Sequence, residues 1–385
     1  MTTYVPASIP VLTWAAERSG LADEQLLSRF SKWQKWLDGE ANPTMRQLET
    51  FASLTHTPIG YFFLPEPPEI SLPVPDFRTF RDSDIAEPSA NLLDTIYLCQ
   101  QRQEWYKEYA RIQAYDPLTF VGKATADDDP EAVAADIRDV LGLSIEERQR
   151  LSTWADALRQ LIRKIEDAGV MVMISSVVGS NSHRKLNLEE FRGFALSDDY
   201  APLIFLNGAD SKSAQMFSLV HELAHVWLGQ SGVSDTTTGS VPRLQVEKWC
   251  NQVAAEVLVP MASLRDSYNT RNDLTLEIQR LARLFKVSSL VILRRIHDAG
   301  YIDTDTLWST YHAEVERIHA LDERAGGGGG DFYRSLGARV SSLFARAVLS
   351  STLEGQTSFT DAFRMLGVRK ATTFYEAARQ LGVAQ

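Results

Sequence analysis

The sequence has few of the features that mark secreted, membrane-spanning or nucleic-acid-binding proteins. Its 385 residues include only Cys99 and Cys250 as cysteines, which excludes a disulfide framework and fits a reducing compartment. No apolar run approaches the roughly 20 residues that a membrane span needs. The segment Met1–Pro6 lacks a basic stretch leading into an apolar one, so we expect no signal peptide. Together these absences predict a cytoplasmic protein without a membrane partner.

Positive charge is also scarce relative to negative charge. There are 39 Lys and Arg residues against 50 Asp and Glu residues, which gives a formal net charge of −11. Such a chain is not, as a whole, an electrostatic surface for nucleic acids. Hydrophobic residues make up 44% of the sequence, which is ample for a core, and the length indicates two or three domains.

Against this background, the stretch His221-Glu222-Leu223-Ala224-His225 is the most informative part of the chain. It has the H-E-x-x-H spacing of a zinc peptidase helix, in which residues i and i+4 share one face. His221 and His225 can therefore offer two imidazole nitrogens to one zinc ion, and Glu222 can act as general base on water at the open position. A chance match on an ordinary helix is the alternative.

The surroundings of this motif favour a metal site. The flanks 217–220 and 226–228 are almost wholly apolar, so the helix should be buried. Two histidines and a glutamate are costly in such a place unless they have partners, and a metal ion supplies one. Asp210 or Ser211 is a suitable N-cap, and Gly229 is a suitable stop signal.

We expect a third ligand on a second helix, which covers Val246–Val259 and ends before Pro260. Glu247 and Asn251 are four residues apart and share a face, which suits a metal carboxylate with an amide that orients a ligand histidine. Glu256 is the alternative metal ligand. It points to nearly the opposite side of the helix, where a buried carboxylate paired with Arg or Lys is the competing interpretation. We favour Glu247, because Asn251 supports its face.

The other candidate groups have no ligand-like spacing. Cys250 lies close to Glu247, but a free cysteine among apolar residues usually behaves as a small hydrophobe. Tyr301, or a histidine outside the motif, could donate to the oxyanion of a tetrahedral intermediate. These histidines are His56, His183, His297, His312 and His319. The Ser-, Thr- and Gly-rich segment Gly232–Arg243 is a natural candidate for a lid.

Several motifs in order resemble the ImmA/IrrE family of metallo-endopeptidases. They are Arg192–Leu196, Tyr200–Gly208, Gln215–Phe217 leading into His221–Gly229, and Glu247–Pro260. The resemblance covers roughly residues 75–310. The N-terminal region resembles the Xre-type helix-turn-helix modules often fused to this family, and the C-terminal stretch resembles the tail of a subgroup associated with toxin–antitoxin pairs.

The resemblance implies a small sheet packed on a thermolysin-like zinc helix, with His221, His225 and Glu247 as ligands and Glu222 as base. It also implies cytoplasmic proteolysis of a repressor, antitoxin or toxin partner, which is typical of stress-response regulation. The strand Leu203-Ile204-Phe205-Leu206 would then be the edge that pairs with a substrate backbone, although the same residues fit a plain core strand.

Composition divides the chain into four parts. We expect a helix-turn-helix-like module over 1–64, a proline-rich linker over 65–85 and a zinc metallopeptidase-like domain over 86–310. A helical tail over 326–385 follows the glycine run Gly326–Gly330. The predicted fold class is α+β and mostly helical.

Periodicity places the main elements of the two larger parts. Helices are expected over Ala90–Tyr115 and Glu146–Ala168, and two or three more over Leu276–Ile302. The β-branched run Val170–Val178 predicts a central strand.

The N-terminal module shows helical patterns at Val11–Gly20 and Thr44–Ala52, but the section between them is compressed into Asp23–Lys32. Its 64 residues carry five Lys or Arg and six Asp or Glu, so it lacks the basic face that DNA binding needs. Protein docking or self-association, including a homodimer, is therefore favoured over DNA.

Two functions remain open. The first is a cytoplasmic zinc-dependent endopeptidase that acts on a regulatory protein, such as a partner encoded nearby. The alternative is an antitoxin-like regulatory protein that holds a toxin or binds DNA, with the peptidase site silent.

Overall fold

The computed structural model describes residues 3–76, 87–234, 245–322 and 332–384. The chain forms two compact units, residues 1–73 with 80–97 and residues 74–79 with 98–385. Within the described residues, no helix is long and apolar enough to cross a membrane.

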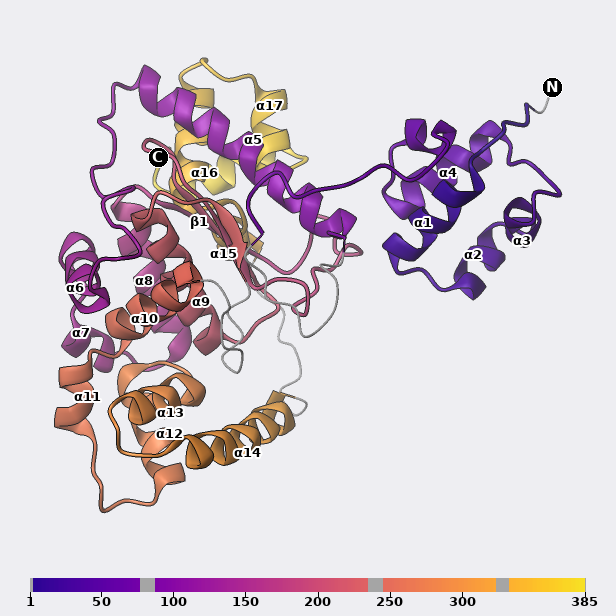
Figure 1. The fold of residues 1–385 in the computed structure, drawn as a ribbon. Coiled ribbons are helices and arrows are strands. Elements are labelled where there is room, and N and C mark those ends of the chain that lie inside the picture. The colour runs from indigo at the N-terminus through magenta and orange to yellow at the C-terminus, as the bar shows by residue number, and fades with distance from the viewer. Residues whose placement is uncertain (1–2, 77–86, 235–244, 323–331, 385) are drawn as a thin grey trace. The chain divides into compact units, whose positions relative to one another are not determined.

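The first unit is a small helical bundle (Figure 1). Its elements are α1 (Ile9–Ser19), α2 (Asp23–Arg29), α3 (Trp33–Leu37), α4 (Met45–Thr55) and the 3-10 helix η1 (Ile59–Phe63). Thr44 and Gln47 form a capping box at the start of α4. The aromatic side chains of Trp33, Trp36 and Phe51 pack in the core. The tryptophans of α3 therefore hold this short helix to the bundle.

A four-stranded sheet of order β1-β3-β2-β4 organises the second unit. Its strands are β1 (Met171–Ser175), β2 (Gly193–Leu196), β3 (Leu203–Asn207) and β4 (Gly232–Ser234). β1 runs parallel to β3, while β2 is antiparallel to both β3 and β4. The fold is thus α+β and mostly helical, as predicted.

Two strand predictions are wrong. The run that includes Met171–Ser175 was expected in the middle of the sheet, but β1 is an edge strand. The sequence of β1 is apolar because helices α15 (Phe332–Val340) and α16 (Ser342–Leu353) pack against the strand. Conversely, Leu203–Leu206 was expected at an edge, but β3 lies between β1 and β2 and all its residues are buried. It is a core strand, with both backbone edges already paired.

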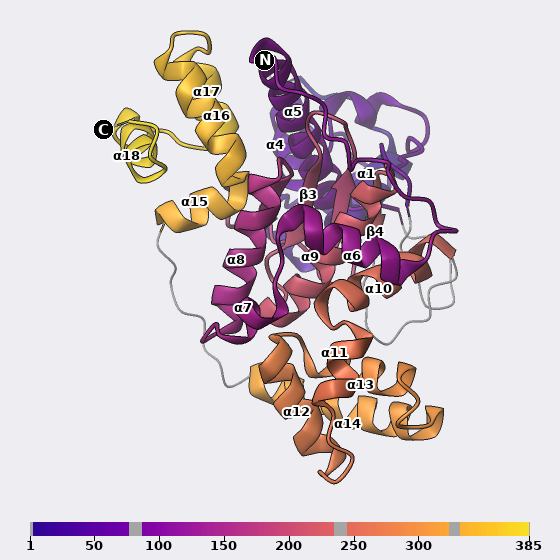
Figure 2. The ribbon, with the colours of Figure 1, turned by 90° about the vertical axis from the view of Figure 1, so that its left-hand side faces the viewer.

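Helices α5 (Ala90–Ile112), α8 (Trp154–Asp167) and α9 (Lys212–Trp227) contact strands of this sheet (Figures 1 and 2). Helix α10 (Gln245–Leu258) packs on α9, and α6 (Pro130–Leu141) packs on α10. The short helix α7 (Ile145–Gln149) precedes α8. The helix expected over Glu146–Ala168 is in fact two, α7 and α8. The chain turns between them, and Thr153 caps α8 by accepting a hydrogen bond from the Asp156 amide.

Two further groups of helices complete the second unit. One gathers at one end of it in both views and comprises α11 (Met261–Ser267), α12 (Leu274–Phe285), α13 (Ser289–Asp298) and α14 (Thr304–Asp322). The other is C-terminal and comprises α15, α16, α17 (Phe359–Leu366) and α18 (Ala371–Gln380). Glu166 of α8 accepts the Ser342 amide at 2.8 Å, and Arg102 of α5 donates to the Met365 carbonyl at 3.1 Å. The C-terminal helices are therefore docked on the core. The glycine run Gly326–Gly330 lies outside the described residues.

Candidate metal centre

Helix α9 places both motif histidines inside the protein. It begins after Ser211, whose hydroxyl accepts a hydrogen bond from the Ala214 amide at 3.3 Å, and Gly229 follows its end with a φ of +66°. One helical turn separates His221 from His225, so both rings leave the helix on the same face. Both residues are 0% exposed, so bulk solvent does not reach them.

Helix α10 packs against α9 and brings Glu247 to the two rings. The Glu247 carboxylate lies 3.2 Å from His221 Nε2 and 3.0 Å from His225 Nε2. The two Nε2 atoms lie 3.2 Å from each other. One turn further along α10, the Asn251 Oδ1 atom lies 3.0 Å from His221 Nδ1. The structure therefore gathers the three predicted ligands and the predicted supporting amide in one place.

This geometry fits a tetrahedral metal ion. Bonds of 2.0–2.1 Å in a tetrahedron separate the ligand atoms by about 3.3–3.4 Å, close to the distances between the three groups here. Asn251 accepts the Nδ1–H of His221, which leaves the Nε2 lone pair of that ring facing the cluster. Two imidazole nitrogens and a carboxylate form a donor set that zinc commonly takes in catalytic sites. The residues therefore suit the ion that the motif implies.

Glu222 is buried beside this cluster, at 0% exposure. It lies against Gly193 of β2, where an added Cβ would come within 3.0 Å of Glu222 Oε1. Neither carboxylate oxygen makes a well-aligned hydrogen bond among the described residues, and the Ser234 hydroxyl is a polar neighbour that offsets part of its burial. A buried carboxylate in this state is costly unless a ligand, water or ion completes it.

Burial and charge shift the pKa values of the site residues in different directions. Burial, and then the charge of Glu247, raise the pKa of Glu222 well above its ordinary value, while the nearby Ser234 hydroxyl acts against this. Burial would also raise the pKa of Glu247, but the two histidines outweigh it and bring that pKa down to about 2. Burial lowers the pKa of His225. Glu247 is therefore anionic and His225 neutral near pH 7, the forms that bind metal.

The competing carboxylate lies elsewhere. Glu256 is buried, forms an ion pair with Arg295 and accepts the Met261 amide at 3.1 Å. This is the arrangement of a paired structural carboxylate, on the side of α10 opposite Glu247. The structure thus does not bring the alternative ligand to the cluster.

The remaining candidates also stay out of the cluster. Cys250 is buried in the apolar core, and burial raises the pKa of its thiol. His183, His297 and His312 are not part of the cluster, which within the described residues consists of His221, His225 and Glu247. The side chain of His319 lies outside the described residues, as does the expected lid from residue 235 onwards.

Two residues at the site were missed from the sequence. Gly193 leaves the space that Glu222 fills, and a glycine within an apolar strand is a recognised sign of close approach. The Ser234 hydroxyl, at the end of β4, lies 3.3 Å from His225 Nε2. No local pattern marks Ser234, because the strand pairing alone carries it to the metal helix.

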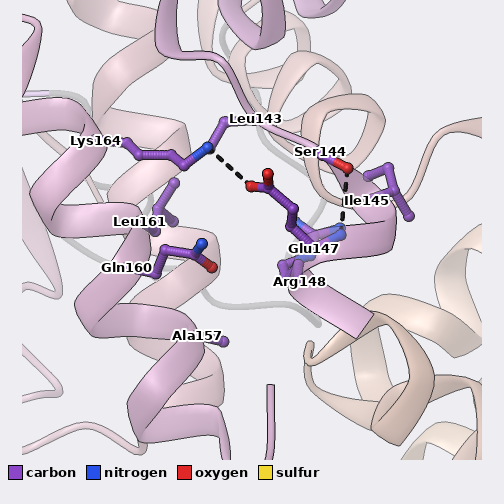
Figure 3. Close-up of a pocket in the computed structure, with 9 residues that line it drawn as sticks. All are labelled: Leu143, Ser144, Ile145, Glu147, Arg148, Ala157, Gln160, Leu161 and Lys164. Atoms are coloured by element: carbon purple, nitrogen blue, oxygen red, sulfur yellow. Dashed lines mark hydrogen bonds and ion pairs between the residues drawn. The ribbon is translucent and has the colours of Figure 1, made fainter. Parts of the chain in front are cut away.

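A pocket away from this centre has a structural explanation. Figure 3 shows it between α7 and α8, where Lys164 lies 3.2 Å from a Glu147 oxygen. The other contact drawn there is the Ser144 cap of α7, at 3.2 Å. The first contact is a surface ion pair and the second is a helix cap, and neither indicates catalysis. The candidate site therefore remains the cluster on α9 and α10.

Comparison with known proteins agrees with this location. Residues 165–297, about a third of the chain, match the M78 peptidase family model, described as an IrrE N-terminal-like domain. The matched region contains His221, Glu222, His225 and Glu247. Residues 340–380, which include helices α16, α17 and α18, match a domain of unknown function (DUF8813). No curated protein matches the chain.

Proposed function

We propose that this protein is a zinc-dependent endopeptidase of the ImmA/IrrE type that cleaves a regulatory protein in the cytoplasm. The observation that carries the proposal is the gathering of His221, His225 and Glu247, with the Glu222 carboxylate buried beside them and without a well-aligned hydrogen bond among the described residues. The M78 family match supports a metallopeptidase at the same residues.

Each residue then has a defined task. His221, His225 and Glu247 hold the ion, and Asn251 fixes the ring of His221. Zinc bound there supplies a Lewis acid that acidifies water and polarises a peptide carbonyl. Glu222 takes the proton that the attacking water loses and delivers it to the leaving nitrogen as the C–N bond breaks.

The environment of Glu222 suits a group that both accepts and donates a proton. Burial and the nearby charge of Glu247 raise its pKa, which makes its carboxylate a stronger proton acceptor than an exposed glutamate. Gly193 leaves room for the carboxylate and limits where it can lie. The mechanism therefore depends on the fit of the α9 helix against β2 as well as on the ligands.

The test is a comparison of wild type with Glu222→Gln. The purified proteins are analysed for zinc and then incubated with a proteome-derived peptide library, and new peptide termini are mapped by mass spectrometry. We expect one zinc per chain in both proteins and a loss of cleavage of at least about 100-fold in the variant. Absence of zinc, or equal cleavage by the variant, would contradict the proposal.

The complete burial of the site favours a second candidate. His221, Glu222 and His225 are 0% exposed, as expected for a site at rest in a regulatory or antitoxin-like protein that holds a partner encoded nearby. Neutralisation of that partner by Glu222→Gln as well as by wild type would favour this binding function. Salt-dependent DNA binding in a gel shift would instead support a transcriptional role for the N-terminal unit.

A further inference from the structure

Strand β4 lies at one edge of the sheet and reaches the metal cluster. It pairs with β2 through Val233 and its neighbours, and it ends at Ser234 beside His225. One side of β4 is thus used within the sheet, while its outer backbone edge faces away from β2. An extended polypeptide that pairs with this outer edge would run past the cluster.

That outer edge is already taken by another part of the same chain. The Val233 amide donates a hydrogen bond to the Pro75 carbonyl at 3.0 Å, and Asp76 and Val233 form a parallel bridge. Residues 74–76 belong to the same compact unit as the sheet. The pairing is therefore an isolated parallel β-bridge supplied from the proline-rich linker.

The occupant lies near the surface of the protein. Pro75 has no N–H, so at that position it offers only its carbonyl, and its ring is exposed to solvent. Val74 and Asp76 on either side are only partly buried. By contrast, Val233 is 0% exposed. Strand β4 is therefore buried at this position, whereas residues 74–76, which pair with it, lie near the surface.

We propose that residues 74–76 are an intramolecular occupant of the β4 edge, and that an extended polypeptide must displace them to reach the metal cluster. This inference rests on the proposed peptidase function and adds its regulation. The complete burial of His221, Glu222 and His225 agrees with a site whose approach is occupied. Because residues 1–73 of the first unit continue directly into residues 74–76, a partner bound to that unit is covalently linked to the occupant.

A reducible disulfide that ties residue 76 to β4 (the lock) tests the proposal. Asp76→Cys and Val233→Cys are combined, since bridge partners lie within disulfide reach, while native Cys99 and Cys250 are buried. The zinc-loaded protein is titrated with a tripeptide hydroxamate before and after reduction with TCEP, and Asp76→Cys alone is the control. We expect the oxidised double variant to bind at least tenfold more weakly than its reduced form, with no redox effect in the control. Equal binding in both forms overturns the proposal.

The opposite change loosens the occupant. Val74→Gly, Pro75→Ser and Asp76→Gly are combined, and the matched control carries Gly-Ser-Gly at residues 69–71 of the same linker. Weakening one backbone hydrogen bond corresponds to about 2- to 13-fold tighter hydroxamate binding, and we expect this only for the 74–76 variant. Identical affinities in both variants and wild type overturn the proposal.

The failure of this inference differs from that of the proposed function. If none of the proteins retains zinc, the peptidase proposal fails together with the regulation. If zinc is bound and the hydroxamate binds, but neither the lock nor the loosening changes its affinity, only the occupancy of the β4 edge is refuted.

Discussion

The contact between Gly193 and Glu222 gives a sharp prediction, because it can disturb the base without touching a ligand. A Cβ at Gly193 would lie 3.0 Å from Glu222 Oε1 and 3.0 Å from the Phe205 carbonyl oxygen. The Phe205 carbonyl belongs to the central strand β3 and has little freedom to move. The strain of Gly193→Ala therefore falls on the Glu222 carboxylate.

The expected magnitude follows from that distance. Glu222 Oε1 must retreat by about 0.4 Å to reach an ordinary contact of 3.4 Å. Since a misplacement of about 1 Å can cost about 100-fold in rate, we expect Gly193→Ala to reduce kcat/KM about 5- to 10-fold. Overpacking should also lower the free energy of unfolding by about 1–3 kcal/mol. Zinc affinity should not change, because the three ligands keep their positions.

The assay compares this variant with a glycine that is equally crowded but remote. At Gly208, a Cβ would meet backbone atoms of Ser175 and Ser176 at 3.1 Å, without any contact to Glu222. Both variants are measured for zinc affinity, for urea unfolding and for cleavage of the best peptide from the library. Gly208→Ala should lose stability to a similar extent but keep its rate.

Two results would refute this reasoning. One is a Gly193→Ala protein with the wild-type rate, which would mean that the position of Glu222 does not limit turnover. The other is an equal loss of rate in Gly208→Ala, which would assign the effect to general destabilisation.

Three further predictions concern ligands and pH. The Glu256→Ala protein should keep its zinc but lose about 3 kcal/mol of the free energy of unfolding, because Arg295 is left buried without its carboxylate partner. Loss of zinc in elemental analysis would instead make Glu256 a ligand. Asn251→Ala should weaken zinc binding about 10- to 100-fold in a chelator competition, and unchanged affinity would deny its orienting role. Hydrogen bonds from a neighbouring arginine hold the pKa of Glu277 at about 2, below its ordinary 4.5, so its stabilisation is present above pH 4.5 and is lost as the pH falls towards 2. The Glu277 side chain is 0% exposed, but that of its partner Arg280 is 45% exposed, so solvent screening reduces a nominal contribution of about 3 kcal/mol to about 1–2 kcal/mol. Urea unfolding of Glu277→Gln should lack this pH dependence.

The metal helix could be predicted because its information is local. Spacing of four residues puts His221 and His225 on one face, and Ser211 and Gly229 mark the ends of the helix. Helical periodicity showed that Glu247 and Glu256 lie on opposite faces, and Asn251 on the face of Glu247 decided between them. Among the described residues, the structure places Glu247 beside the histidines.

The strand order could not be predicted in the same way. Both β1 and β3 are apolar along their length, because helices bury the edge strand β1 as thoroughly as the central strand β3. Hydrophobicity reports burial and not position in a sheet. The pairing of Val233 with Pro75 joins residues more than 150 positions apart, and no local pattern records it.

The break between α7 and α8 has a similar origin. Apolar periodicity runs through the region, but Ser144 and Thr153 each cap a separate helix. Cap residues were visible in the sequence and carried the missing information.

The central claim is that His221, His225 and Glu247 hold one metal ion. Anomalous diffraction measured at the zinc edge, on crystals of protein purified without chelators, tests it most directly. The account predicts a single peak about 2.0–2.1 Å from the Nε2 atoms of both histidines, and at a similar distance from a Glu247 oxygen. A crystal with zinc at Glu256 or Cys250, or without zinc at the histidines, would contradict it.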